Sequence, residues 1–190
     1  MGVRSARLGS DPVRADPGYD RAGDLRFDHK GAFVTESVKV GDRFPAGELV
    51  ASDGQRVDLE SLEGPAVIYF YPADGTETCT IEAVEFNRAV DEYKAANVAL
   101  VGVSVDDDES HRCFAQDQGL RFPLVADVGR ELSDKLGLTK DYGEYGMLSG
   151  RVTLLLDRDA IVRATWTPEE KDLKDHPGQA LEAARALEAS

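Results

Sequence analysis

The sequence predicts an α/β fold, in which helices cover a mixed central β-sheet. Two unbroken apolar and β-branched runs of strand length, 66–71 and 98–105, are typical of central strands buried on both faces. The segment between them, 77–96, has the apolar spacing of a helix that connects parallel strands. Shorter strand and helix patterns then follow to the C-terminus. Together these features indicate one layered α/β domain.

The elements before and inside this β-α-β unit are justified by turn chemistry and periodicity. Two short stretches, 48–51 and 56–59, flank a turn that contains Gly54, which predicts an N-terminal β-hairpin. In the helix, Phe86, Val90 and Tyr93 fall at positions i, i+4 and i+7 and form an apolar face. The hairpin therefore precedes the sheet, and the helix packs against it.

The second half continues the alternation of strands and helices. We expect a helix over 109–118, capped by Ser110 or by the acidic run 106–109 and ended by Gly119. The remaining predicted elements are a strand over 122–126, a short helix over 129–136, a hairpin formed by 151–156 and 161–166, and a closing helix over 179–187.

Composition limits the domain organisation and the partners. Residues 1–36 mix Gly, Pro, Asp and Arg without periodicity and are predicted to be a disordered or loosely docked arm, so that residues 37–190 form the only domain. The net charge of -14 argues against nucleic-acid and membrane partners. No apolar run of about eighteen residues occurs and residues 1–36 lack a signal-like stretch, so we expect a cytoplasmic protein.

Cys79 is one of only two cysteines, and its position favours reactivity. It follows a buried strand in the first turn of the predicted helix, where free N–H groups and the helix dipole stabilise a thiolate. Glu77 and Glu82 lie within a turn of it and oppose that charge, so a cation has to offset them. A buried, unreactive thiol is an equally good interpretation of the position alone.

The run YFYPADGTETCT at 69–80 resembles the signature of the peroxiredoxins. Further segments, VGD at 40–42, GLRFPL at 119–124 and RVTLLLD at 151–157, resemble the bacterioferritin-comigratory or Q-type branch of the AhpC/TSA superfamily. The resemblance covers roughly residues 38–187. It implies a thioredoxin-like fold and the reduction of hydrogen peroxide and organic hydroperoxides by a thiol donor such as thioredoxin. Q-type relatives are often monomers, and we expect a monomer.

The resemblance also implies roles for individual residues. Cys79 matches the peroxidatic cysteine, Thr76 the hydroxyl that bonds thiolate and peroxide, and Pro72 the residue that shields the site from water. Arg151 matches the active-site arginine, and an always-charged guanidinium can offset the two glutamates and stabilise a leaving oxygen. In isolation, a helix cap is the better interpretation of Thr76 and a strand-edge charge that of Arg151, but their joint spacing with Cys79 reverses this preference.

The second thiol, Cys113, has three possible interpretations. Many Q-type members carry a resolving cysteine five residues after the peroxidatic one, where this chain has Val84. A subset carries it on the next helix, which corresponds to Cys113, and we predict a Cys79–Cys113 disulfide that needs local unwinding after Thr76. The alternatives are a buried core thiol beside Phe114 and a one-cysteine cycle completed by an external thiol.

Other classes of function are less well supported. A disulfide oxidoreductase uses Cys-x-x-Cys, and Thr76 stands where the first of those cysteines belongs. A non-catalytic thioredoxin-fold binding module is a further alternative. The three histidines, His29, His111 and His176, do not have the spacing of a metal site, and we expect them to be solvated or locally hydrogen-bonded. No bound cofactor or metal is predicted.

Overall fold

A computed structural model describes residues 37–189, which belong to one compact unit. The arm predicted for residues 1–36 lies outside the described residues. The central sheet has the order β5 (Leu124–Ala126), β4 (Ala99–Ser104), β3 (Ala66–Phe70), β8 (Val152–Leu156) and β9 (Val162–Trp166). Strands β3, β4 and β5 are parallel, while β8 and β9 run antiparallel to their neighbours. The predicted mixed sheet is confirmed.

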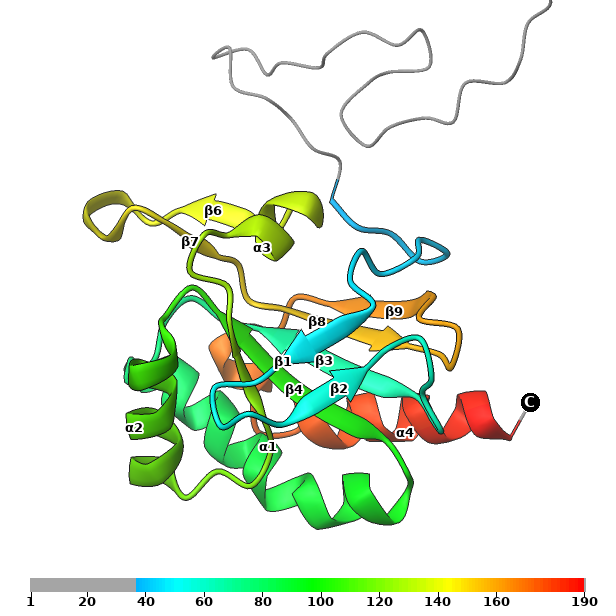
Figure 1. Cartoon of the computed structure of the whole chain (residues 1–190). Helices are drawn as coiled ribbons and strands as arrows, with labels where there is room; N and C mark the ends of the chain where they lie inside the picture. The colour runs from blue at the N-terminus through cyan, green and yellow to red at the C-terminus, as the bar shows by residue number, and fades with distance from the viewer. Residues whose placement is uncertain (1–36, 190) are drawn as a thin grey trace, which may run out of the picture. The chain divides into compact units, whose positions relative to one another are not determined.

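Strand β3 lies at the centre because both of its faces are apolar. Ile68 and Phe70 point into one buried cluster, and Val67 and Tyr69 point into the other. The helices α1 (Glu77–Ala95), α2 (Asp108–Gln118) and α4 (His176–Glu188) contribute to the cluster of Val67. Figure 1 shows α1 and α4 along the same side of the sheet. No helix among residues 37–189 has the length and apolar character needed to cross a membrane.

The opposite face is covered by smaller elements. The hairpin of β1 (Glu48–Val50) and β2 (Arg56–Asp58) and the short helix α3 (Glu131–Lys135) pack there. All three elements lie within the ranges that the sequence predicts for them. A hairpin of β6 (Thr139–Asp141) and β7 (Met147–Ser149) was not predicted, nor were the 3-10 turns η1 (Gly143–Tyr145) and η2 (Glu170–Asp172). Helix α4 starts at His176, ahead of the predicted Gln179.

Strand directions decide which residues meet at the edge of the sheet where α1 begins. Strands β3 and β4 are parallel, so the segments after them, which carry Asp74 and Asp106, emerge at the same edge. Strand β8 is antiparallel to β3 and pairs Val152 with Phe70, so Arg151 precedes β8 at that edge too. Residues far apart in the sequence are therefore brought to the start of α1.

Candidate active site

Cys79 lies at the third position of α1, where the sequence predicted it. Its side chain is only 2% exposed and belongs to the apolar cluster that contains Tyr69, Tyr71 and Phe86. The first N–H groups of a helix have no partner within the helix, and the helix dipole is positive there. The sulfur is thus held in an apolar pocket at the end of a helix that favours negative charge.

The Arg151 guanidinium reaches this sulfur from the start of β8. Its Nη2 donates to Cys79 Sγ at 3.2 Å, while Nη1 forms an ion pair with the Glu82 carboxylate. Both partners of that ion pair are largely buried, and Glu82 is only 1% exposed. Arg151 is therefore the cation that the sequence analysis required near Glu77 and Glu82. It contacts both the Cys79 sulfur and Glu82.

Glu82 is a buried partner of Arg151, a role that the sequence did not indicate. Burial raises the pKa of the Glu82 carboxyl to about 7, and the charge and hydrogen bond of Arg151 only partly oppose this effect. Its Oε1 atom is buried without a hydrogen-bond partner. The sequence analysis treated Glu82 as a repulsive neighbour of Cys79. The available signal was its spacing, because positions i and i+3 share a helix face.

Thr76 and Pro72 lie in the connection between β3 and α1. Thr76 is the N-cap residue of α1, but its side chain makes no capping hydrogen bond. Its hydroxyl instead donates to the carbonyl of Ala73 at 3.3 Å. Pro72 is partly buried in the same loop. Their roles toward thiolate and peroxide stay predictions, since no described contact joins the Thr76 hydroxyl to Cys79.

Cys113 lies on α2 with its side chain exposed, and both thiols are unpaired in this structure. The alternative of a buried core thiol beside Phe114 is therefore wrong. Phe114 faces the core, and the preceding position on an α-helix is turned about 100° away from it, toward solvent. An accessible thiol on α2 is thus available for reaction.

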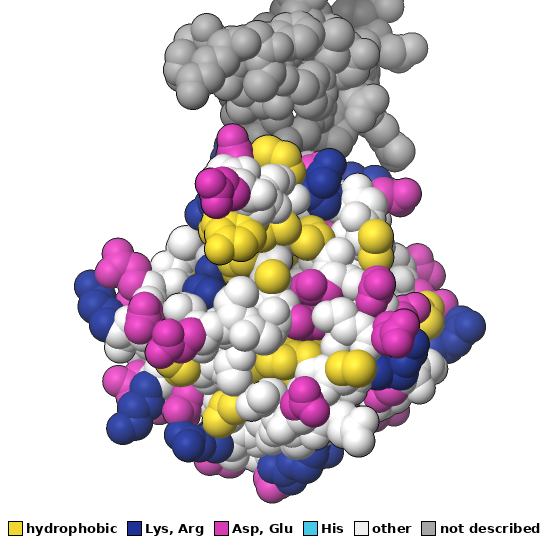
Figure 2. Space-filling model, turned by 90° about the vertical axis from the view of Figure 1, so that its left-hand side faces the viewer, with side chains coloured by type: hydrophobic (Ala, Val, Ile, Leu, Met, Phe, Trp, Pro, Cys, Tyr) yellow, Lys and Arg dark blue, Asp and Glu magenta, His cyan; other side chains and the backbone are white. Residues whose placement is uncertain are grey.

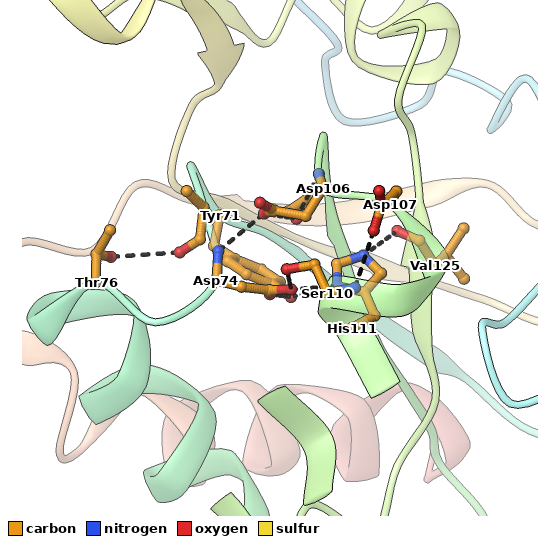
Figure 3. Close-up of polar contacts among 10 residues, drawn as sticks. Tyr71, Asp74, Thr76, Asp106, Asp107, Ser110, His111 and Val125 are labelled. Carbon is orange, nitrogen blue, oxygen red and sulfur yellow. Dashed lines mark hydrogen bonds and ion pairs between the residues drawn. The ribbon is translucent and has the colours of Figure 1, made fainter. Parts of the chain in front are cut away.

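A buried polar network beside the site was not predicted. Figure 3 shows Asp74, from the loop before α1, against Ser110 and His111 of α2. His111 is not solvated, since it is 1% exposed and its partners are distant in the sequence. His176 is also buried, which lowers its pKa to about 4, whereas His29 lies outside the described residues. Sequence spacing offered no signal for the pairing of Asp74 with His111.

No three His, Cys, Asp or Glu side chains within residues 37–189 are grouped as metal ligands. The acidic run before α2 serves the helix instead, with the Asp107 side chain accepting from Ser110 N–H. Asp107 is therefore the cap, in agreement with the prediction that this run initiates the helix.

Comparison with known proteins decides the family. Residues 40–165 match the AhpC/TSA family. The chain belongs to the AhpC/TSA family. Among curated relatives of this peroxiredoxin, the chloroplastic peroxiredoxin Q of Suaeda salsa is 34% identical over 157 residues, which are 82% of this chain and 72% of that protein.

Solved structures agree with this assignment. The peroxidoxin BcpB of Mycobacterium tuberculosis superposes with a TM-score of 0.70 at 28% identity, over 79% of this chain and 98% of that one. A bacterioferritin comigratory protein of Xanthomonas campestris, from a study of its alkyl peroxide reduction, superposes with a TM-score of 0.66 at 30% identity, over 80% of this chain and 99% of that one.

The protein is thus a peroxiredoxin of the Q or bacterioferritin-comigratory type, with a thioredoxin-like fold, and it is a thiol-dependent peroxidase. The predicted family, fold class and enzyme class are confirmed. The family assignment also excludes the alternative of a non-catalytic binding module. A peroxide is the substrate and a thiol the electron donor.

Proposed function

We propose that Cys79 is the nucleophile that attacks the peroxide. The observation that carries this assignment is the hydrogen bond from Arg151 Nη2 to Cys79 Sγ at the start of α1. A guanidinium stays charged at all physiological pH values and stabilises a thiolate together with the helix dipole. The same cation is placed to stabilise the negative charge that develops on the oxygen leaving the sulfur.

The first step consumes one peroxide. The Cys79 thiolate attacks one peroxide oxygen, an S–O bond forms and the O–O bond breaks. The other oxygen leaves as an alkoxide or hydroxide and takes up a proton, which yields an alcohol or water. Cys79 is oxidised to a sulfenic acid, and the peroxide is reduced.

Thr76 and Pro72 complete the proposed site. Thr76 is within three residues of Cys79, and rotation about its Cα–Cβ bond would turn the hydroxyl from the Ala73 carbonyl toward the site. The hydroxyl then bonds the thiolate and the bound peroxide. Pro72 has no N–H group to solvate and packs partly buried in the loop, which fits a role in excluding water.

Cys113 is the proposed resolving thiol. Its sulfur attacks the sulfur of the Cys79 sulfenic acid, an S–S bond forms, and the S–O bond breaks to release water after protonation. The exposure of Cys113 supports this role, and the burial of Cys79 means that the first turn of α1 has to unwind first. In the alternative cycle, a small external thiol attacks the Cys79 sulfenic acid directly.

The electron donor is proposed to be thioredoxin in the cytoplasm, which returns the disulfide to two thiols.

Organic hydroperoxides are proposed substrates beside hydrogen peroxide. Tyr145 and Met147 are exposed on the β6–β7 hairpin, and Tyr145 is 81% exposed. Figure 2 shows apolar side chains gathered on the part of the surface where this hairpin projects. Alkyl peroxide reduction is also the subject of the Xanthomonas campestris study.

Peroxide consumption with dithiothreitol as the donor tests the nucleophile. Cys79→Ser is expected to abolish turnover, because a serine hydroxyl is not ionised at neutral pH. Cys113→Ser is the matched control and is expected to keep turnover, since dithiothreitol can reduce the sulfenic acid itself. Full activity of Cys79→Ser would remove Cys79 from the mechanism.

Mass spectrometry after one equivalent of peroxide tests the resolving thiol. The wild type is expected to yield an intramolecular Cys79–Cys113 disulfide, and Cys113→Ser is expected to accumulate sulfenic acid on Cys79, which a second equivalent of peroxide oxidises to sulfinic acid. Reduced Cys113 throughout the wild-type reaction would support the one-cysteine cycle instead.

A further inference from the structure

His111 is the centre of the polar network between the active-site loop and α2. Its Nδ1 lies 2.8 Å from Asp74 Oδ2, and its Nε2 lies 3.2 Å from the carbonyl oxygen of Val125. Both partners are acceptors, because the Val125 carbonyl has no proton and both Asp74 oxygens already accept hydrogen bonds, from Tyr71 and Ser110. The two ring nitrogens therefore both donate, which requires the protonated imidazolium form.

The charge environment of His111 agrees with this form. Burial lowers the pKa of His111, but the hydrogen bond and charge of Asp74, the Val125 carbonyl and the charge of Asp106 outweigh it and raise the pKa above its ordinary value. The other group that faces the ring is the Tyr71 hydroxyl, 3.5 Å from Nδ1. No cation contacts the ring among the described residues, so the charge of Asp74 is balanced by His111.

Asp74 is held from several elements at once. Its Oδ1 accepts from Tyr71 at the end of β3, and its Oδ2 accepts from Ser110 as well as from His111 (Figure 3). Its backbone N–H donates to Asp106, which follows β4. The loop before α1 is thus fixed to the first turns of α2 by a buried ion pair and further hydrogen bonds. Such a charged, buried pair is expensive to break by removing one partner.

Each residue of this pair is close in the sequence to one of the two thiols. Asp74 precedes Cys79 by five residues, and five extended residues span about 17 Å. Cys113 follows His111 by two positions on α2, so their Cα atoms are about 5 Å apart. His111 is buried and Cys113 exposed, and half the circumference of a helix with side chains is roughly 16 Å. Cys79 can therefore reach Cys113 while Asp74 stays bound to His111.

We propose that the ion pair of His111 with Asp74 is the fixed point about which the start of α1 unwinds, so that Cys79 is kept within reach of Cys113 during disulfide formation. This inference rests on the proposed role of Cys113. His111 is a positioning residue in this scheme, because it acts through Asp74 and does not touch the reacting sulfur. Without the pair, the segment after β3 keeps only the hydrogen bonds of Asp74 to Tyr71, Ser110 and Asp106, so it is held less firmly and the two sulfurs meet less often.

The proposal gives the disulfide-forming step its own pH dependence. The folded-state pKa of His111 is raised, so the charged pair is intact below the ordinary histidine value of about 6.5 and is lost as the pH rises through the folded-state pKa. The ratio of the wild-type rate to that of Asp74→Asn, which lacks the ion pair, cancels every pH effect that the two proteins share.

Rapid mixing with peroxide, followed by quenching, alkylation and mass spectrometry, measures the sulfenic acid and the disulfide separately. His111→Gln and Asp74→Asn are each expected to slow disulfide formation by about tenfold or more, the usual effect of losing a buried charged hydrogen bond. Sulfenic acid formation is expected to change by less than about threefold, since Arg151 reaches Cys79 from β8. The double variant should be no slower than the slower single variant, because both changes break one pair.

His176→Gln is the matched control, since His176 is equally buried but bonds Thr153. It is expected to form the disulfide at the wild-type rate. Near-UV circular dichroism checks that each variant is folded. If His111→Gln does not fold, Asp74→Asn and the pH dependence of the rate ratio carry the test, with the ratio expected to fall toward one as the pH rises.

The outcomes separate this inference from the proposed function. Absence of a Cys79–Cys113 disulfide in the wild type would overturn the resolving role of Cys113 and the fixed point with it. A wild-type disulfide that forms equally fast or faster in His111→Gln and Asp74→Asn would overturn the fixed point alone. A neutral His111 ring at pH 6, below the ordinary histidine value of about 6.5, seen in its nitrogen chemical shifts, would also overturn it.

Discussion

Arg151 bonds two buried acceptors through two different nitrogens of one side chain. The planar guanidinium places Nη1 against Glu82 and Nη2 against Cys79 Sγ at the same time. A lysine ammonium carries the same charge on a single nitrogen and lacks this fork. The site therefore depends on the geometry of the cation as well as on its charge.

Arg151→Lys is expected to lower kcat/KM for peroxide by roughly 100-fold, the usual cost of losing one donor that stabilises the transition state. Stopped-flow peroxide reduction under saturating dithiothreitol measures this change. Arg121→Lys is the matched control, because Arg121 forms an exposed ion pair with Asp91 away from the site. A variant with wild-type kcat/KM would show that charge alone is sufficient.

Glu82 is expected to make stability depend on pH. Its pKa is raised from 4.5 to about 7, so the folded protein binds a proton there that the unfolded chain has lost. The free energy of unfolding should therefore fall as the pH rises from about 4.5 to 7, by up to roughly 3 kcal/mol at about 1.4 kcal/mol per pKa unit.

Glu82→Gln removes this titration, and urea denaturation at several pH values compares the two proteins. The difference in unfolding free energy between wild type and Glu82→Gln is expected to change with pH across that window and to be constant above it. A difference that stays constant from pH 4.5 to 7 would show that Arg151 keeps Glu82 ionised throughout.

The sequence was informative about residues whose roles depend on local position. Cys79 could be placed from the strand and helix periodicity around it, and Arg151 from its family motif. The pairing of Asp74 with His111 joins residues 37 positions apart through a sheet edge, and no local pattern encodes such a contact. The sequence also did not show whether Cys113 lies on the buried or the exposed face of α2. That helix has few apolar residues to mark its buried side.

At the scale of elements, α2 is the helix on which the second thiol and the loop contacts depend. Asp107 caps its first turn, and Gly119 ends it in the left-handed conformation with φ 61°. Asp107→Ala is expected to cost about 1 kcal/mol of stability, measured as a lower urea midpoint, since one helix N–H loses its partner. Asp107→Asn retains a capping oxygen and should cost much less. Equal losses in both variants would show that the charge, rather than the cap, stabilises the helix.

The elements with long apolar runs were predicted within a few residues, because burial on both faces leaves a continuous signal in β3 and β4. The β6–β7 hairpin was missed for the opposite reason. Its strands have three residues each, half of these residues are exposed, and within residues 37–189 the two strands pair only with each other. Short strands without a buried face carry no periodicity that distinguishes them from loop.

For the whole molecule, charge and sheet edges favour a monomer. The net charge of -14 repels a second copy, and the edge strand β9 carries the exposed Arg163, which discourages strand-to-strand association. Sedimentation velocity is expected to give a monomer before and after one equivalent of peroxide. A dimer that appears on oxidation and is lost with Cys113→Ser would point to an intermolecular disulfide.

In the proposed cycle, the ion pair between Arg151 and Glu82 bears on the pocket that Cys79 leaves when it forms the disulfide. A lone guanidinium in an apolar pocket would pull water or an anion into the vacated space. Glu82 remains beside the guanidinium as a buried partner when the thiol leaves. In the proposed cycle, Arg151 is thereby kept in position for the return of the sulfur.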